Sequence, residues 1–528
     1  MAITGLKALQ SEDFRKQQEL GEKLTKLFAS LDFEPIEIPT IVDMSVVEKA
    51  NSKFSADVFK LMDKDGTVLA LRTELTQPIA KLVAQRFDRI NLPQKFFYNS
   101  KVYRFSGFAT DAAREIQQIG VEAFGEEVSD LEIADLMLKS IAISGLKKFK
   151  LTITHAAIWH QIFKLYGNPD MDFSTELDYL MQSNYFKSKI KQDNKWSLAA
   201  KAYKFLLDGD LIALEKNCKE IFLLLHSTDI KQIEETLGID LSELKAILAL
   251  DPNVVFDALQ CPDLKLYTGF HMNLYAQGSG RLIALGGRYD KLCSQFGKDI
   301  PAIGFAFYVP GLLAALKHTD EEKTLRIALS KGTLLDGAIE FLKTKKIEVD
   351  LSNKRKLISQ STGETYGFQK IEILLVRGHD VPIYVQHGAA DLGVVGLDTI
   401  IDSKANVSHL KDLGYGACTL SVCAPKNKYQ SVADLPEYTK VSTTFPVITK
   451  DFFASTTTVV EIINLYGSVE LGPLTGLSDV IVDLVASGKT LEENGLEVVE
   501  KILDCTARLI CNNASYKLYK SNINKVLY

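Results

Sequence analysis

The first part of the chain alternates between helical and strand patterns. Leucine and phenylalanine recur at three- and four-residue spacing between Ser11 and Leu31, which predicts an amphipathic helix. Alternating apolar and polar residues then predict a strand over residues 33–39. Two further strands are expected over residues 95–104 and 116–123, with a polar, glycine-containing loop between them.

A long helical region interrupts these strands. From about residue 171 to 255 the chain is rich in leucine, isoleucine and alanine and contains few glycines, so we expect an inserted helical subdomain. Strand-like sequence returns over residues 264–307. A charged run at 317–323 then separates two apolar blocks and is the best candidate for a linker. Beyond it, strands alternate with helices, beginning with a strand at 325–329, and this order predicts a parallel sheet with helical crossovers.

These patterns predict a multidomain protein with an α+β part and an α/β part. A chain of 528 residues is too long for a single hydrophobic core. We assign residues 1–320 to the first domain, with the helical insertion inside it, and residues 321–528 to the second domain.

The composition argues against several classes of protein. The apolar fraction of 46% and the charged fraction of 24% are those of a soluble globular protein, and the net charge of −6 argues against a nucleic-acid partner. No stretch is long and apolar enough to predict a membrane span, and no secretory signal is evident. Seven scattered cysteines and eight histidines form no metal-ligand spacing, so we expect a cytoplasmic protein with reduced thiols and no bound structural metal.

One strand of the second domain carries the clearest chemistry. Residues 480–485 have the β-branched composition of a buried strand, but Asp483 interrupts it. A buried carboxylate is costly without partners. The loop that follows, Ala486 to Thr490, supplies hydroxyl groups, backbone N–H groups and a helix N-terminus suited to a phosphate. A glycine turn with a capping aspartate is the alternative interpretation of these residues alone.

The surrounding sequence, over residues 324–516, closely resembles the short-form catalytic subunit of ATP phosphoribosyltransferase. The similarity lies in segments that follow one another in the family's order: 325–332, 372–382, 390–396, 412–418, 467–473, 479–491 and 506–510. The resemblance implies two α/β lobes like those of periplasmic binding proteins, about 324–420 with 506–528, and about 421–505. It also implies that phosphoribosyl pyrophosphate (PRPP) reacts at C1 with N1 of ATP, with Mg²⁺ as cofactor and pyrophosphate as the second product.

The resemblance assigns roles to individual residues. Lys331 and Arg377 are the expected cations around pyrophosphate, and Glu470 and Asp483 the expected partners of the ribose hydroxyls. The predicted substrate-binding set is Gly332, Arg355, Asp483, Ala486, Ser487, Gly488, Lys489 and Thr490. The similarity is looser around Arg355. The family usually has arginine where this chain has Thr333, so one substrate contact is in doubt.

Residues 5 to about 316 resemble histidyl-tRNA synthetase and, more closely, its paralogue that regulates the short transferase. The matching segments are 71–74, 102–104, 117–122, 266–269, 286–290 and 302–305. The resemblance implies a class II synthetase fold, built on an antiparallel sheet. Two arginines that synthetases use for adenylate chemistry are absent, since the chain has 261–265 and 308–311 in their places, and no anticodon-binding domain follows. We therefore reject aminoacylation.

An amino-acid pocket is what remains of the synthetase site. Glu74 is expected to take an α-ammonium group, while Gln118, Glu122 and Tyr267 are expected to bind an imidazole, with Arg104 in the same set. The alternative is that Gln118 and Glu122 only complete hydrogen-bond networks in the sheet. The sequence thus predicts a transferase that histidine inhibits through residues 1–320, in a homo-oligomer. A non-catalytic histidine or nucleotide sensor with solute-binding lobes is the alternative.

Overall fold

The computed structural model describes residues 5–6, 8–49, 58–89, 91–105, 113–182, 196–321, 323–350 and 357–527. They form two compact units, each assembled from two stretches of sequence. Unit 1 comprises Met1–Gly167 and Cys218–Glu321, and unit 2 comprises Asn168–Asn217 and Glu322–Tyr528. None of the helices described is both long and apolar enough to cross a membrane.

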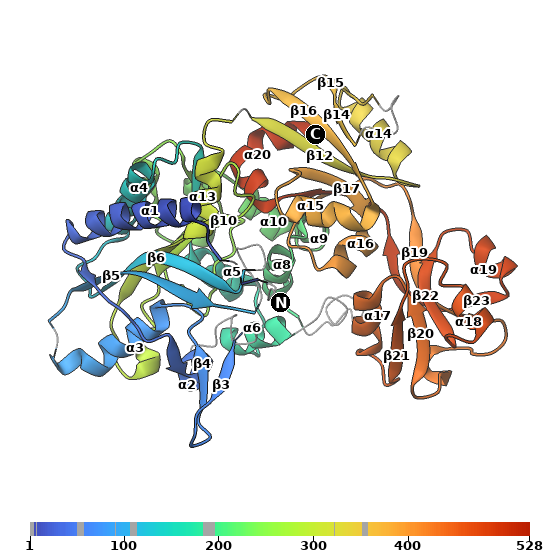
Figure 1. Cartoon of the computed structure of the whole chain (residues 1–528), viewed down its shortest axis with the longest axis horizontal. Coiled ribbons are helices and arrows are strands. Elements are labelled where there is room, and N and C mark those ends of the chain that lie inside the picture. Colours follow the sequence, from blue (N-terminus) through green and yellow to red (C-terminus); the bar gives the residue numbers. More distant parts are fainter. Residues whose placement is uncertain are drawn as a thin grey trace. The chain divides into compact units, whose positions relative to one another are not determined.

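Unit 1 is built on an eight-stranded sheet (Figure 1). The central strands are antiparallel, and only the two edge pairs, β1 with β5 and β7 with β8, are parallel. In sheet order the strands are β1 (Glu34–Pro35), β5 (Gln94–Tyr103), β6 (Glu115–Phe124), β11 (Ala302–Tyr308), β10 (Leu282–Arg288), β9 (Phe270–Ala276), β7 (Phe149–His155) and β8 (Val254–Phe256).

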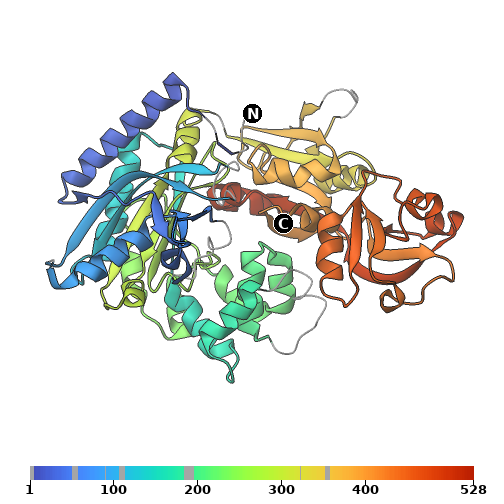
Figure 2. The ribbon, with the colours of Figure 1, turned by 60° about the horizontal axis from the view of Figure 1, so that its bottom comes forward.

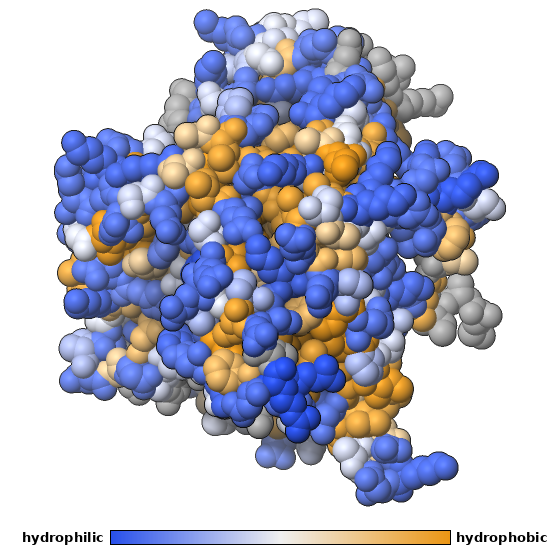
Figure 3. Space-filling view, turned by 90° about the vertical axis from the view of Figure 1, so that its left-hand side faces the viewer, coloured by the Kyte–Doolittle hydropathy of each residue, from blue (hydrophilic) through white to orange (hydrophobic). Residues whose placement is uncertain are grey.

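Helices cover the sheet of unit 1. Helix α1 (Ser11–Ala29) turns Leu20, Leu24 and Phe28 inward, in agreement with the expected amphipathic helix, and it is the dark-blue helix beside the sheet in Figure 2. The helices of this unit are α1 (Ser11–Ala29), α2 (Met44–Lys49), α3 (Thr76–Arg86), α4 (Asp130–Ser144), α5 (Ala156–Tyr166), α10 (Lys219–His226), α11 (Ile230–Leu237), α12 (Ser242–Leu248) and α13 (Val309–Lys317). Figure 3 shows one face of the molecule, where hydrophilic residues are interspersed with apolar patches.

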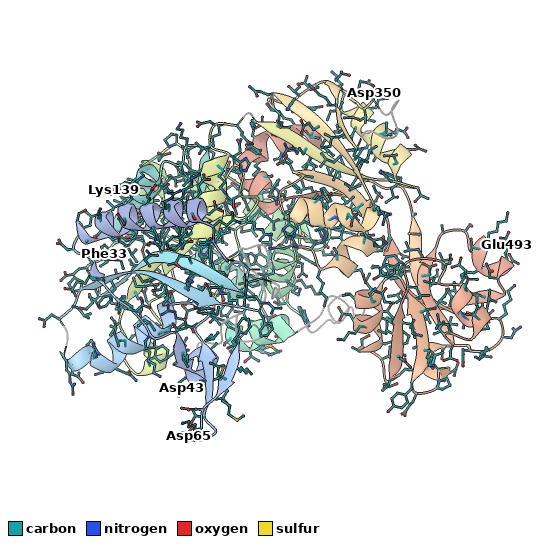
Figure 4. All side chains as sticks on the ribbon, in the orientation of Figure 1. Phe33, Asp43, Asp65, Lys139, Asp350 and Glu493 are labelled. Atoms are coloured by element: carbon teal, nitrogen blue, oxygen red, sulfur yellow. The ribbon has the colours of Figure 1, made fainter. Side chains whose placement is uncertain are left out.

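A small antiparallel sheet of three short strands completes unit 1. Its order is β2 (Ile41–Asp43), β4 (Val68–Leu71) and β3 (Lys60–Met62). Asp65 lies in the turn that joins β3 to β4, at the tip of this hairpin (Figure 4).

Unit 2 contains two larger sheets, and each forms the centre of a lobe. We call these lobes lobe 1 and lobe 2. The lobe 1 sheet has the order β14 (Ile358–Gln360), β16 (Lys370–Val376), β12 (Thr324–Ser330), β17 (Leu392–Gly396), β24 (Ala507–Cys511) and β18 (Ser408–Asp412). Strands β16, β12 and β17 are parallel, as expected for this part of the chain. A short pair, β13 (Ile347–Glu348) and β15 (Thr362–Gly363), lies beside α14 (Leu335–Thr344), and the other helices are α15 (Val381–Gln386), α16 (Leu397–Ser403) and α20 (Asn513–Leu527).

The lobe 2 sheet has five strands. Their order is β21 (Val460–Asn464), β20 (Thr439–Thr443), β22 (Val480–Val485), β19 (Cys418–Pro425) and β23 (Leu496–Cys505), with helices α17 (Pro446–Phe453), α18 (Leu471–Thr475) and α19 (Lys489–Glu493). Strand β22 has the bounds that its β-branched composition predicts. Two segments connect the lobes, one leading from β18 to β19 and the other from β23 to β24.

The helical insertion is divided between the two units. Its first helices, α6 (Phe173–Gln182), α8 (Leu198–Leu207) and α9 (Leu211–Asn217), belong to unit 2, where α9 packs against β18. The helices α10, α11 and α12 belong to unit 1. Helical character is therefore confirmed for the described part of the insertion, but the insertion is not one compact subdomain.

The strand expected over 33–39 is much shorter in the structure. Only Glu34 and Pro35 pair with β5. Pro35 and Pro39 have no N–H groups to donate to a sheet, so a proline-rich stretch of this kind pairs only briefly, at the edge.

Candidate functional site

Two predicted cations lie next to each other at one end of the lobe 1 sheet. Lys331 directly follows β12 and Arg377 directly follows β16, and these strands are parallel neighbours. The backbone N–H of Lys331 donates to the carbonyl oxygen of Val376 at 2.9 Å, which joins the two strand ends. Both side chains are exposed, and Gly332 lies in the same turn. The carboxyl ends of parallel strands are the usual ligand-binding edge of α/β sheets, so two positive charges are available to an anion there.

Two carboxylates lie together in lobe 2. Asp483 is in β22, opposite Ser421 of β19, and Glu470 immediately precedes α18. Burial raises the pKa of the Asp483 carboxyl, and the negative charge of Glu470 acts in the same direction, while a hydrogen bond with the backbone at Leu484 lowers it. A carboxylate with a raised pKa beside a second acid is stabilised by a cation or by hydroxyl donors. The pair can therefore bind sugar hydroxyls or a metal ion.

The loop after β22 is open to solvent. Ala486, Ser487 and Thr490 are exposed, and Gly488 is the residue before α19. The backbone N–H of Lys489 is 3.5 Å from the Ser487 hydroxyl oxygen, which makes this hydrogen bond within the loop long and weak. Helix α19 ends at Glu493, whose side chain lies at the surface (Figure 4). Hydroxyl and N–H groups in this loop can reach a phosphate.

The predicted substrate residues are distributed over both lobes. Lys331 and Arg377 are on lobe 1, and Glu470 and Asp483 are on lobe 2. Among the described residues, no ion pair joins the two cations to the two carboxylates. The four charges therefore do not neutralise one another. Arg355 lies outside the residues that the structure describes.

Unit 1 contains a pocket that brings together all five residues predicted to bind histidine. It encloses about 870 Å³, including the part open to solvent. The lining residues include Glu74, Arg104, Gln118, Glu122 and Tyr267. The hydrophobic pattern places Gln118 and Glu122 on one face of β6 because side chains alternate along a strand. The pocket is large enough for an amino acid.

Glu122 is the most strongly buried acid in the pocket, with 1% of its surface exposed. Its Oε1 accepts hydrogen bonds from the hydroxyls of Thr76, at 2.6 Å, and Tyr98, at 3.4 Å. Its Oε2 accepts one from the Tyr289 hydroxyl. Burial raises the pKa of the Glu122 carboxyl well above its ordinary value, although the Thr76 hydrogen bond acts the other way. A ligand N–H or cation would relieve this desolvation.

Glycine at position 304 makes room for this acid. Gly304 of β11 lies opposite Glu122 of β6. A Cβ atom at Gly304 would come within 2.3 Å of Glu122 Oε2 and within 2.7 Å of the Tyr289 hydroxyl. Any side chain there would displace the carboxylate, so the glycine keeps the pocket floor open.

Glu74 and Arg104 also line the pocket. The Glu74 carboxylate accepts hydrogen bonds from the backbone N–H of Gln77, at 3.1 Å to each oxygen. Burial raises the pKa of Glu74 to about 7, against the opposing influence of that hydrogen bond and of the Arg104 charge. Arg104 is buried, and its Nε donates to the carbonyl oxygen of Thr73 at 2.7 Å. The pocket therefore presents two acids and one guanidinium, which suits a zwitterionic ligand.

Sequence reasoning missed several pocket residues. Thr76, Tyr98, Tyr289 and Gly304 all line the pocket but were not predicted to bind the ligand. Tyr289 and Gly304 lie inside segments that already suggested the synthetase resemblance, so their position was an available signal. No such signal marked Thr76 or Tyr98.

Comparison with known proteins matches different families to the two parts of the sequence. Residues 5–312 match the family model described as histidyl-tRNA synthetase, and residues 377–528 match the model described as ATP phosphoribosyltransferase. An ATP phosphoribosyltransferase from Crocosphaera subtropica is 45% identical over 205 residues, which is 38% of this chain and 93% of the relative. One from Syntrophomonas wolfei is 44% identical over 204 residues, 38% of this chain and 92% of the relative.

Three solved structures are also similar. A histidine–tRNA ligase subunit from Alicyclobacillus acidocaldarius is 25% identical, with 61% of this chain and 98% of that chain covered and a TM-score of 0.46. An ATP phosphoribosyltransferase regulatory subunit/histidyl-tRNA synthetase from Bacillus halodurans is 23% identical, with 71% and 98% covered and a TM-score of 0.47. An ATP phosphoribosyl transferase complex from Thermotoga maritima is 30% identical, with 38% and 94% covered and a TM-score of 0.33.

The two family matches and the curated relatives define a pentosyltransferase joined to a synthetase-like domain. The chain belongs to the ATP phosphoribosyltransferase family through its C-terminal part and to the histidyl-tRNA synthetase family through its N-terminal part. It is a transferase of histidine biosynthesis, as the resemblance implied.

Proposed function

We propose that unit 2 joins C1 of PRPP to N1 of ATP, releasing pyrophosphate, and that histidine bound in the unit 1 pocket inhibits this reaction. The bond from C1 to the pyrophosphate oxygen breaks as the bond from C1 to adenine N1 forms. The observation that supports the catalytic part is the pair of cations, Lys331 and Arg377, at neighbouring parallel strand ends of lobe 1. We assign residues 1–320 to regulation and residues 321–528 to catalysis.

The transfer needs charge stabilisation more than a nucleophilic side chain. Positive charge develops on the ribose and negative charge on the departing pyrophosphate, and fixed charges act strongly on such a transition state. We assign Lys331 and Arg377 to the pyrophosphate, because they are exposed cations at a ligand-binding edge. Glu470 and Asp483 accept hydrogen bonds from the ribose hydroxyls, and Asp483 also faces the developing positive charge.

The loop from Ala486 to Thr490 is assigned to the 5-phosphate. Its hydroxyls and backbone N–H groups are solvent-exposed at the end of β22. Asp483 lies three residues before the loop, so one strand end would hold both the phosphate and the sugar of the same substrate. A lobed arrangement like that of periplasmic binding proteins, closing around substrate, remains our proposal for how the two lobes meet the ligand.

The donor set fits Mg²⁺ held jointly with substrate. Among the described residues no group of three or more histidine, cysteine or acidic side chains could hold a metal alone. The Asp483 and Glu470 pair, with the raised pKa of Asp483, offers one or two carboxylates, and neither forms an ion pair with a described residue. Mg²⁺ is commonly bound by one or two carboxylates together with substrate phosphates. When bound, the ion would neutralise charge on pyrophosphate.

Histidine fits the unit 1 pocket by charge and size. Glu74 would take the α-ammonium, Arg104 the α-carboxylate, and Glu122 with Gln118 and Tyr267 the imidazole. For histidine to inhibit, it must bind the inhibited conformation more tightly than the active one. A homo-oligomer and a cytoplasmic location remain predictions of the sequence.

The test of the catalytic assignment is direct product analysis. The protein is incubated with ATP, PRPP and Mg²⁺, and phosphoribosyl-ATP and pyrophosphate are quantified by chromatography and mass spectrometry. Equal amounts of the two products support the proposal. A folded protein that binds PRPP and ATP in calorimetry without forming product would instead support the sensor with solute-binding lobes.

A further inference from the structure

Each of the two segments that connect the lobes of unit 2 carries a cysteine. Cys418 is the first residue of β19, just after the chain leaves lobe 1, and Cys505 is the last residue of β23, just before it returns. The two residues lie directly opposite each other in the antiparallel pairing of these strands. Both cysteines are free thiols in the structure.

This position suits a covalent bond between the two sulfur atoms. Directly opposed residues of antiparallel strands have Cα atoms roughly 4.5–5.5 Å apart and project to the same face of the sheet. Disulfides join residues whose Cα atoms are about 4.4–6.8 Å apart. Cys418 and Cys505 can therefore be joined with little movement of the backbone.

The two thiols are already chemically unequal. A hydrogen bond with Cys505 lowers the pKa of the Cys418 thiol, although burial acts against it. The same hydrogen bond, reinforced by burial, raises the pKa of Cys505. Cys418 is also the more exposed of the two. Attack on a small disulfide requires an accessible thiolate, so Cys418 is suited to react first and Cys505 to react second.

A second cysteine of β19 lacks this arrangement. Cys423 lies in the same strand as Cys418, but its partner in β23 is Val498. Burial raises the pKa of the Cys423 thiol to about 12. The paired position, rather than burial in this sheet, therefore distinguishes Cys418 and Cys505.

The connecting segments around the pair are bonded to each other. Asp412 accepts a hydrogen bond from the Thr506 hydroxyl at 2.8 Å and forms an ion pair with Arg508 at 3.0 Å. Next to the cysteines, the Thr419 hydroxyl donates to Asp504 at 2.7 Å. A covalent bond at this point would add a rigid link to segments through which any movement of one lobe relative to the other must pass.

We propose that Cys418 and Cys505 form a redox-reversible pair that exchanges with low-molecular-weight disulfides and slows phosphoribosyl transfer when oxidised. The Cys418 thiolate attacks one sulfur of the small disulfide and releases one thiolate, which leaves a mixed disulfide on Cys418. Cys505 then loses its proton, and its sulfur attacks Cys418 sulfur and displaces the second small thiol. Two protein thiols and one small disulfide thus become one protein disulfide and two small thiols. The effect on turnover rests on the proposed function, whereas the exchange does not.

The experiment incubates the full chain with oxidised glutathione and follows two readouts. Peptide mapping without reductant is expected to find the peptides of Cys418 and Cys505 cross-linked in the wild type. Turnover is expected to fall about fivefold or more, because the cross-link restricts a lobe movement on which the rate depends, and to return with dithiothreitol. Cys505→Ser should stop at a glutathione adduct on Cys418, and Cys423→Ser should behave like the wild type.

The two readouts fail separately. An oxidised wild type without the Cys418–Cys505 cross-link overturns the proposal, and so does a cross-linked protein that turns over as fast as the reduced one. If the reduced protein forms no product, the proposed function fails. In that case the peptide mapping, together with the thermal stability of the oxidised and reduced protein, still shows whether Cys418 and Cys505 exchange with the glutathione disulfide.

Discussion

The backbone N–H of His409 donates a 2.8 Å hydrogen bond to the carbonyl oxygen of Gly209. His409 belongs to β18 of lobe 1, whereas Gly209 lies between α8 and α9, in sequence that is inserted into the synthetase-like part. The adjacent Asp210 forms a parallel bridge with His409, and Leu211 packs against the lobe 1 core. Part of the synthetase-like sequence is therefore physically part of the transferase unit.

From this contact we predict that a substitution outside the pocket can weaken the inhibition of turnover by histidine. Gly209 has φ +69°, and a Cβ atom there would lie 2.3 Å from the carbonyl oxygen of Val407. We expect Gly209→Ala to push α9 away from β18 and to reduce the ratio of turnover without histidine to turnover with it. The measurement is this ratio at saturating substrates.

A second glycine provides the matched control for that variant. Gly238 has φ +64°, and no atom lies within 4 Å of the position its Cβ would occupy. Both alanine variants incur the cost of a left-handed backbone, on the order of 1 kcal/mol, but only the change at Gly209 creates a clash. Equal histidine inhibition in the two variants would contradict a role for the Gly209 contact.

The pocket assignment predicts a difference between two neighbouring glutamines. Gln118 lines the pocket, whereas Gln117 projects to the other face of β6 and donates to Asn99 at 2.7 Å. We expect Gln118→Ala to weaken histidine binding about tenfold, the effect of one lost hydrogen bond to a ligand, and Gln117→Ala to leave it near the wild-type value. Isothermal titration calorimetry with histidine measures both. Similar dissociation constants for the two variants would place the ligand elsewhere.

The catalytic assignment predicts that one carboxylate is essential. Asp483→Asn keeps the shape of the side chain but removes the charge that faces the ribose, so we expect kcat to fall about 100-fold or more, as when other preorganised charges are removed. Glu493→Gln removes an exposed carboxylate at the end of α19 and serves as the control. Steady-state assays of phosphoribosyl-ATP formation compare them. An Asp483→Asn enzyme with wild-type kcat would exclude the assigned role.

Glu74 predicts a pH dependence of stability. Burial raises its pKa in the folded protein to about 7 from 4.5. Below the unfolded-state pKa both states hold the proton, so Glu74 costs nothing there. As the pH rises from 4.5 to about 7 the unfolded chain releases the proton while the folded protein still holds it, so stability is lost over this interval and stays level above it. Between pH 4.5 and about pH 7, the interval that the two pKa values bracket, Glu74→Gln should lose less thermal stability than the wild type. The measurement is the melting temperature of both proteins as a function of pH. If the two melting temperatures change equally with pH over this interval, the raised pKa of Glu74 is contradicted.

The local sequence pattern was sufficient to predict those elements that are defined by their own residues. Helix α1 and strand β22 were predicted because apolar spacing and β-branched composition directly reflect the faces that they bury. Gln118 and Glu122, four residues apart in the expected strand, lie on one face of β6 because side chains alternate along a strand. These residues reach the pocket through simple strand geometry.

Long-range packing could not be predicted in the same way. The insertion has a uniform helical pattern, and nothing in that pattern distinguishes α9, which packs on β18, from α10, which belongs to the other unit. Thr76 and Tyr98 come from α3 and β5, and only the folded sheet brings their hydroxyls to Glu122. The opposition of Cys418 and Cys505 depends on strand register, which the sequence does not specify across 87 positions of separation.

We propose that one chain both performs phosphoribosyl transfer and senses histidine in its synthetase-like pocket. The most direct measurement is the rate of phosphoribosyl-ATP formation, followed by absorbance, as histidine is added to the wild type and to Glu122→Gln. We expect histidine to suppress the wild-type rate and the variant to need at least about tenfold more histidine, because the buried carboxylate is no longer there to bind the ligand. Turnover that histidine does not change, or that it suppresses equally in both proteins, would contradict it.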